Sequence, residues 1–177
     1  MASKVPFRFE IVSFDLGSPR IDDVVSFYSS VFLSETDRSR RLVHDAMQRK
    51  DYFGRVAYVD DAAVAMAYGA ACIVGHWWYD TIAQAVGSDH PSLQNSWNLM
   101  ELAVLSSFRR RGLATALVDD LLVAQPCPRA LLSVIVHNAP ARTFYENGGW
   151  RYLHSDLTFA AVPNRRYAIM GRELGAI

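Results

Sequence analysis

The chain has 177 residues, of which 51% are hydrophobic, 20% charged and 12% aromatic, and its 18 basic residues balance 18 acidic ones. This length and composition are typical of one compact domain with its own core, which excludes disordered, collagen-like and coiled-coil proteins. A net charge of zero argues against a general binder of nucleic acids or anionic membranes, because both need a surplus of Lys and Arg.

The first half of the chain shows strand and helix periodicity in turn. The predicted elements are a strand over 7–14, helices over 21–32 and 39–48, a strand hairpin formed by 54–59 and 62–74, and a short helix over 77–86. A loop is expected over 87–92, where Gly, Ser, Asp and Pro are concentrated.

The second half alternates strands with helices more regularly. The predicted elements are a strand over 99–105, a helix over 112–123, a strand over 131–136, a helix over 139–147, and two strands over 150–154 and 167–172. This order predicts a mixed sheet with βαβ units concentrated in the C-terminal half.

Cysteine usage and the chain ends indicate a cellular compartment. Cys72 and Cys127 lie in apolar runs, and we expect them to be reduced, buried residues of a cytosolic protein. The N-terminal residues lack the apolar core of a signal peptide, and no apolar stretch is long enough to span a bilayer. A cytoplasmic location without membrane association is therefore expected.

Several well-known site motifs are missing from the sequence. It contains no phosphate-binding Gly-x-x-x-x-Gly-Lys loop, no His-Glu-x-x-His, no Cys-x-x-Cys and no Gly-x-Ser-x-Gly. The five histidines lie far apart in the sequence and show no ligand spacing. We therefore expect no metal site.

The most informative stretch is a predicted strand, a basic turn and the start of a helix over 102–115. Backbone N–H groups in the first turn of a helix have no partners within the helix and carry the positive end of its dipole. Gly112 and Ala114 leave room for an anion to approach these groups, and three consecutive arginines, Arg109–Arg111, border the turn. The stretch favours a diphosphate site, the alternatives being a helix start with solvated arginines or a minor nucleic-acid patch.

Two segments resemble a known family. Arg109-x-x-Gly112-x-Ala114 is similar to the Gln/Arg-x-x-Gly-x-Gly/Ala signature of the GNAT superfamily of acyl-CoA-dependent N-acetyltransferases. The segment 138–150 resembles the Asn-x-x-Ala-x-x-x-Tyr helix of that family, with its Gly-aromatic exit. The order and spacing of the two motifs also agree with the family.

The resemblance implies a fold and a domain organisation. We expect an α/β protein with a single GNAT-like domain over 1–177, in which a mixed sheet of about six to seven strands is flanked by helices. The fourth and fifth strands would splay around the arm of CoA. Residues 1–97 would form the acceptor-side half, and residues 98–177 the half that binds acetyl-CoA.

The resemblance also assigns residues to the acetyl-CoA site. The turn would bind the pyrophosphate, the strand before it would pair with the pantetheine arm through backbone groups, and Asn138 would hydrogen-bond the pantetheine region. Arg142 would reach the arm or a phosphate, although a solvated helix-surface arginine is the commoner outcome. The expected cofactor-binding residues are Leu102, Ala103, Val104, Arg109, Arg110, Arg111, Gly112, Leu113, Ala114, Thr115, Asn138, Arg142 and Tyr145.

Acetyl transfer to an amine needs a base, an oxyanion donor and an acid for the leaving thiolate. Tyr145, near the sulfur, is the expected acid, and the backbone N–H of Val104 or its neighbour the oxyanion donor. Glu101, the only carboxylate in its strand, is the candidate base. Its alternative is a glutamate on the open face of the strand, and His137 is a second candidate base.

The acceptor pocket is expected in the first half of the chain. Its candidate residues are Trp77, Tyr79, Glu101 and Tyr28, since aromatic faces can hold a cationic amine. Trp78 is predicted to anchor its helix in the core instead, and core packing is also the default for Tyr28 and Phe32.

The predicted function is transfer of an acetyl group from acetyl-CoA to a primary amine of a small molecule or a protein, directly and without an acyl-enzyme. The alternative is a non-catalytic CoA-binding sensor or partner subunit with the same fold. Neither a nucleic acid nor a membrane is an expected partner, and a homodimer is compatible with this interpretation.

Overall fold

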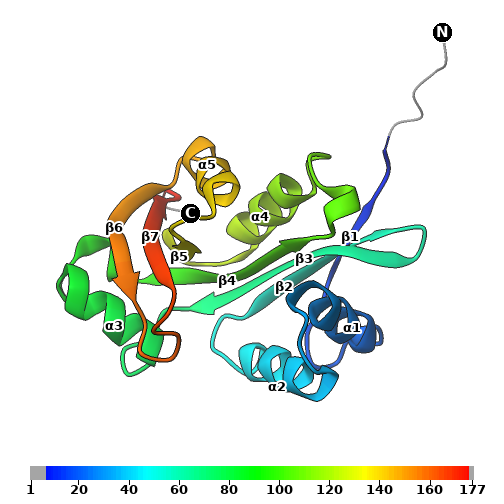
Figure 1. Cartoon of the computed structure of the whole chain (residues 1–177), viewed down its shortest axis with the longest axis horizontal. Helices are drawn as coiled ribbons and strands as arrows, with labels where there is room; N and C mark the ends of the chain where they lie inside the picture. Colours follow the sequence, from blue (N-terminus) through cyan, green and yellow to red (C-terminus); the bar gives the residue numbers. More distant parts are fainter. Residues whose placement is uncertain (1–6, 176–177) are drawn as a thin grey trace, which may run out of the picture. The chain divides into compact units, whose positions relative to one another are not determined.

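The computed structural model of the chain describes residues 7–175. Within this range seven strands belong to one mixed sheet in the order β1-β2-β3-β4-β5-β7-β6, and five α-helices alternate with them along the chain (Figure 1). The described residues group into two compact units, one containing 7–69 and 101–125 and the other 70–100 and 126–175. Strands β3 and β4 contribute residues to both units.

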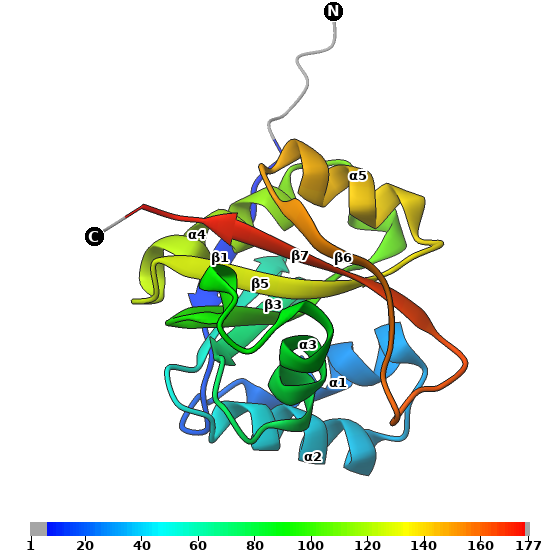
Figure 2. The same ribbon diagram turned by 90° about the vertical axis from the view of Figure 1, so that its left-hand side faces the viewer.

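The first unit combines the N-terminal α/β segment, up to residue 69, with the strand end and helix over residues 101–125. It contains β1 (Glu10–Ser13), α1 (Ile21–Phe32), α2 (Thr36–Met47), β2 (Phe53–Val59), most of β3 (Ala62–Ala71), the second half of β4 (Ser96–Val104), the 3-10 turn η2 (Ser106–Phe108) and α4 (Leu113–Ala124). Strand β2 pairs antiparallel with both β1 and β3. Figures 1 and 2 show α1 and α2 on one side of β2 and β3, with α4 on the opposite side.

Short-range signals explain much of the first unit. Asp60 and Asp61 both have positive φ, 46° and 62°, as the two-residue turn of a tight hairpin requires. An ion pair between Arg55 of β2 and Asp120 of α4 joins the hairpin to its helix. Helix α2 begins three residues before the predicted start at Ser39, whose side chain is fully buried and hydrogen-bonds Ser34 at 2.5 Å.

The second unit is built on an antiparallel group of three strands. It contains α3 (Trp77–Val86), the 3-10 turn η1 (Pro91–Leu93), the first half of β4, β5 (Arg129–Ile135), α5 (Ala139–Asn147), β6 (Arg151–Thr158) and β7 (Arg166–Glu173). Strand β7 lies between β5 and β6 and pairs antiparallel with both. The parallel pairing of β4 with β5 runs from Ser96–Arg129 to Asn98–Leu131 and stops before either strand ends, in agreement with the expected separation of these strands.

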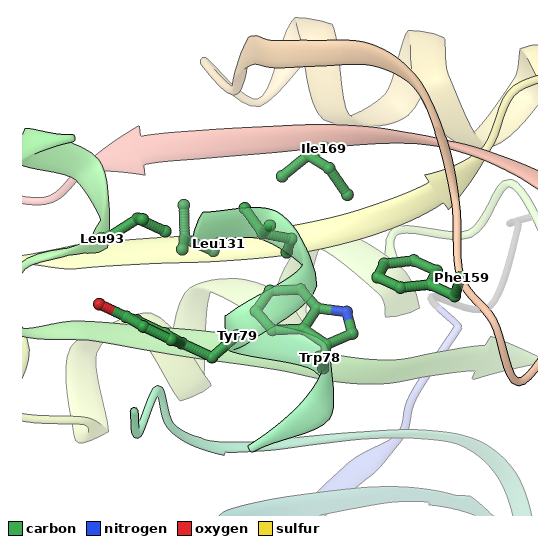
Figure 3. Close-up of a cluster of buried hydrophobic side chains, with 7 residues drawn as sticks. Trp78, Tyr79, Leu93, Leu131, Phe159 and Ile169 are labelled. Carbon is green, nitrogen blue, oxygen red and sulfur yellow. The ribbon is translucent and has the colours of Figure 1, made fainter. Parts of the chain in front are cut away.

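Helix α3 buries an apolar face in the core of this second unit. Trp78 lies beside Leu131 of β5, Ile169 of β7 and Phe159 (Figure 3), and its indole Nε1 donates a hydrogen bond of 3.3 Å to Ser133 Oγ. The prediction that Trp78 anchors its helix in the core is therefore confirmed.

The predicted elements agree closely with those observed. Helices α1, α3 and α5 have the predicted bounds, whereas β1 covers only four of the eight predicted residues, because its pairing with β2 begins at Glu10. Between residues 7 and 175, no helix is long and apolar enough to cross a membrane.

Candidate active site

The basic turn of the first unit leads from β4 into α4. Arg110 has φ +62° and Gly112 has φ +85°, a conformation that favours glycine, so the chain reverses sharply before the helix begins. The first helical hydrogen bond runs from the Ala116 N–H to the Gly112 carbonyl at 3.0 Å. The N–H groups of Leu113, Ala114 and Thr115 therefore precede the helical ladder, as an anion site at a helix start requires.

The space around Gly112 is open. A Cβ atom placed on Gly112 would have no atom within 4 Å, so the approach to the backbone is open. Leu113 is only 1% exposed and anchors α4 in the core, so its side chain does not face a ligand. The positive end of the α4 dipole adds to the attraction for an anion.

The three arginines of the turn differ in their contacts. The Arg109 Nε donates a hydrogen bond of 3.1 Å to the Val104 carbonyl, which fixes the turn to the end of β4. The Arg111 guanidinium lies over the rings of Phe7 and Phe108, at 4.8 and 5.5 Å from their centroids. All three side chains are exposed, so the turn presents a local positive charge on a neutral protein.

Glu101 lies on β4 with its carboxylate hydrogen-bonded to helix α1. Tyr28 donates its hydroxyl proton to Glu101 Oε2 at 3.1 Å. Burial raises the pKa of Glu101 from 4.5 to about 7, although the hydrogen bond from Tyr28 opposes the rise. A carboxyl group with this pKa exchanges its proton near neutral pH, as a general base must.

Sequence reasoning missed Tyr68, which lies behind Tyr28. Tyr68 is 4% exposed, and burial raises the pKa of its hydroxyl well above the usual range, with the charge of Glu101 as the next cause. Strand pairing sets Tyr68 opposite Gly54 of β2, a register that no local sequence pattern shows. No local signal in the sequence could therefore have found it.

In the second unit, Asn138 and Tyr145 are held by helix α5. Asn138 caps the helix, since its Oδ1 accepts a hydrogen bond of 3.2 Å from the Ala141 N–H, and its amide nitrogen remains a donor group. Tyr145 is buried, with its ring 5.1 Å from Phe144 and 5.8 Å from Trp150. Arg142 is half-buried one turn after Asn138.

The aromatic residues of α3 divide by exposure. Trp77 is 54% exposed, and its ring packs edge-on against that of Phe159, with 5.4 Å between the ring centroids. Tyr79 is 8% exposed and packs in the core cluster with Leu93, so its ring stabilises the unit. Of the two, Trp77 presents a surface that a ligand can reach.

The other features considered in the sequence are a metal site, the two cysteines and His137. Among residues 7–175, no group of three or more His, Cys, Asp and Glu residues is placed to hold a metal ion. Cys127 is buried and Cys72 half-buried, and neither forms a disulfide. His137 is exposed directly before Asn138.

Comparison with known proteins identifies a family. A model of the acetyltransferase (GNAT) family matches residues 21–150. No curated protein gives a significant match.

Solved structures show the same fold at low sequence identity. An aminoglycoside 6′-acetyltransferase type Ii is 18% identical with a TM-score of 0.69, covering 95% of this chain and 99% of its own. The ribosomal-protein-S18-alanine N-acetyltransferase from Escherichia coli is 16% identical with a TM-score of 0.62, covering 96% of both chains. NAA60 from Arabidopsis thaliana, solved with acetyl-CoA, is 15% identical with a TM-score of 0.65, covering 94% of this chain and 99% of its own. Together with the family match over 21–150, these results show that the chain belongs to the acetyltransferase (GNAT) family.

Proposed function

We propose that the protein transfers an acetyl group from acetyl-CoA to a primary amine of a small molecule or a protein, directly and without an acyl-enzyme. The observation that carries the proposal is the buried Glu101 carboxylate, held by Tyr28 at 3.1 Å, with a pKa of about 7. A merely structural glutamate on an open strand face would be solvated and would titrate near its ordinary value. Both kinds of acceptor occur among the structural neighbours, in an aminoglycoside 6′-acetyltransferase and a ribosomal-protein-S18-alanine N-acetyltransferase.

The acetyl-CoA side of the proposal rests on the turn before α4. The N–H groups at the start of α4 bind the pyrophosphate, and Arg109–Arg111 add positive charge around it. The backbone of Leu102–Val104 pairs with the pantetheine arm as a strand pairs with a peptide. Asn138 and Arg142 of α5 are proposed to contact the same arm. In this arrangement residues 98–177 supply the acetyl-CoA half of a single acetyltransferase domain, and residues 1–97 the acceptor half.

The proposed reaction assigns one task to each catalytic group. Glu101 takes a proton from the acceptor ammonium, which frees the nitrogen lone pair to attack the thioester carbonyl carbon. The backbone N–H of Val104 or its neighbour stabilises the tetrahedral oxyanion. The C–S bond then breaks, Tyr145 donates a proton to the departing thiolate, and the second proton of the new amide nitrogen returns to the Tyr145 phenolate. A phenol near pKa 10 is protonated at neutral pH and suits this task.

The acceptor is proposed to meet aromatic side chains. Trp77 offers an exposed ring face for a cationic amine, and Tyr28 borders the carboxylate that accepts the proton. Tyr79 supports helix α3, which carries Trp77, from the core of its unit.

Thermal unfolding with acetyl-CoA tests the binding half of the proposal. Acetyl-CoA at 100 times its Kd stabilises the folded state by about 2.7 kcal/mol, which raises the Tm by roughly 5–10 °C for a chain of this size. Gly112→Glu places a carboxylate in the open turn and should abolish this rise. Gly75→Glu is the matched control, because Gly75 has a similar φ of +89° and equally open space but lies outside the turn.

A thiol-release screen tests catalysis. Wild-type protein is assayed with acetyl-CoA against amines, amino acids, aminoglycosides and peptide N-termini. Release of thiol with one acceptor class supports the enzyme. A Tm rise without thiol release for any acceptor indicates the non-catalytic CoA-binding protein instead, and no Tm rise at near-millimolar acetyl-CoA refutes the whole proposal.

A further inference from the structure

One buried polar atom of the second unit lies at the point where two strands separate. Asn98 of β4 is 7% exposed, and its side-chain oxygen Oδ1 is buried without a hydrogen-bond partner among the described residues. We infer that Asn98 is a further binding residue for the acceptor, whose Oδ1 accepts a hydrogen bond from an N–H group of the acceptor amine. This inference rests on the proposed function, because it needs an amine acceptor, and it adds a residue to which that function gives no task.

The position of Asn98 in the sheet supports this role. Asn98 pairs with Leu131 at the last position where β4 and β5 are hydrogen-bonded, so it lies at the fork between the two strands. The proposed function places the pyrophosphate at the turn before α4 and the pantetheine arm along residues 102–104 of β4. An arm that runs in this direction carries its acetyl group toward the fork.

The strand register also gives the face on which the Asn98 side chain lies. Residues paired across neighbouring strands point to the same face of a sheet, so Asn98 shares the face of Leu131. On that face Leu131 packs beside Trp78 of α3 (Figure 3), and Ser133, two residues later on β5, accepts the hydrogen bond from Trp78 Nε1. Asn98 therefore lies on the α3 side of the sheet, and α3 also carries Trp77, the aromatic residue proposed for the acceptor.

An unpaired carbonyl oxygen in the interior needs an explanation. A buried acceptor without a donor loses its hydrogen bonds to water on folding and gains none in return, so most buried polar groups in native proteins are paired. Ser96, two residues earlier on β4, follows this rule, since its buried hydroxyl donates a hydrogen bond of 3.0 Å to the Leu93 carbonyl. Asn98 departs from the rule, and a ligand N–H group at the fork completes its pairing.

A primary amine has the hydrogens that this oxygen requires. Its ammonium form has three N–H groups, so it can release one proton to the base and still donate a hydrogen bond to Asn98. The proposed base, Glu101, follows Asn98 by three residues on the same strand. An alcohol has a single O–H hydrogen, which is the one that the base removes. Asn98 therefore favours amine acceptors over alcohols.

The test measures kcat/KM with the best acceptor of the thiol-release screen. Loss of a hydrogen bond from a charged amine should lower kcat/KM roughly 10- to 100-fold in Asn98→Val. Asn98→Asp keeps an oxygen acceptor in the same position and should retain most of the activity. Ser96→Ala is the matched control, because it removes a buried polar group that has a partner from the same strand, and it should leave kcat/KM unchanged.

Thermal unfolding gives a second readout, in which the two positions differ in sign. Valine is close to asparagine in size, suits a strand and leaves no polar atom unpaired, so Asn98→Val should raise the Tm by roughly 2–10 °C. Ser96→Ala leaves the Leu93 carbonyl without its donor and should lower the Tm by a similar amount. Greater stability with lower activity is the signature of a polar group kept for binding.

Three results would overturn the inference. The first is a kcat/KM of Asn98→Val within twofold of wild type, and the second is an equal loss in Asn98→Asp. The third is a lowered Tm or a lost acetyl-CoA-induced Tm rise in Asn98→Val, since either would assign Asn98 a structural role. If wild-type protein releases no thiol with any amine, the proposed function fails and the inference fails with it, whereas thiol release that Asn98→Val leaves unchanged refutes the inference alone.

Discussion

Replacing Glu101 with glutamine keeps the shape of a buried side chain and removes its charge. In the folded protein the pKa of Glu101 rises from 4.5 to about 7, mainly through burial. A rise of this size corresponds to about 3 kcal/mol of lost stability for the ionised form. Below pH 4.5 the group is protonated in both folded and unfolded chains, so it has no effect there. Between pH 4.5 and 7 the unfolded chain releases the proton first, so stability falls as the pH rises, and above pH 7 the whole penalty is present.

Urea unfolding at several pH values measures this effect. The stability of Glu101→Gln relative to wild type should increase by about 2.5 kcal/mol between pH 5 and pH 8. Glu10→Gln changes an exposed carboxylate on β1 and serves as the control. A stability difference between Glu101→Gln and wild type that does not vary with pH would refute the assigned burial of this charge.

The same variant tests the base. Loss of a general base lowers the rate by about 10²–10⁴-fold, so kcat/KM of Glu101→Gln should fall by at least about a hundredfold at pH 8. Its remaining activity should also lack the acidic limb near pH 7. A variant with wild-type kcat/KM would remove Glu101 from the mechanism.

Other predictions concern Tyr145 and the tryptophans of α3. Tyr145→Phe should slow thiol release while leaving the Kd for acetyl-CoA nearly unchanged. Single-turnover kinetics measure the release, and a binding titration measures the Kd. Unchanged turnover would exclude Tyr145 as the acid. Trp78→Ala should cost about 3–5 kcal/mol in urea unfolding, because the indole is buried and bonded to Ser133. Trp77→Ala should cost less than about 1 kcal/mol but raise KM for the acceptor, and an unaffected KM would exclude Trp77 from the acceptor site.

The parts of the fold that follow from local sequence were predictable. Helix α1 has apolar residues at helical spacing, and α5 starts at the Asn138 cap and stops at Gly148-Gly149, so both were located to the residue. The turn before α4 was equally local, since a strand, three arginines and Gly112 are consecutive in the chain. Signals that lie within about ten residues need no knowledge of the tertiary structure.

Contacts between distant segments were not predictable. The bond from Tyr28 to Glu101 joins residues 73 positions apart, and a strand register places Tyr68 opposite Gly54. Sequence also left open which aromatic residue of α3 faces solvent, because Trp77 and Tyr79 both neighbour the buried Trp78. Which face of α3 is buried depends on its packing against the apolar side chains of β5 and β7, which are distant in the sequence.

The two rings around Arg111 connect the ligand turn to the beginning of the described chain. Phe7 and Phe108 lie 6.2 Å apart and both face the Arg111 guanidinium. A side chain held in this way has already lost rotamer freedom. Binding of an anion to Arg111 would therefore cost less side-chain entropy. If the turn binds an anion as proposed, shortening the chain past Phe7 should weaken that binding without altering any residue of the turn itself.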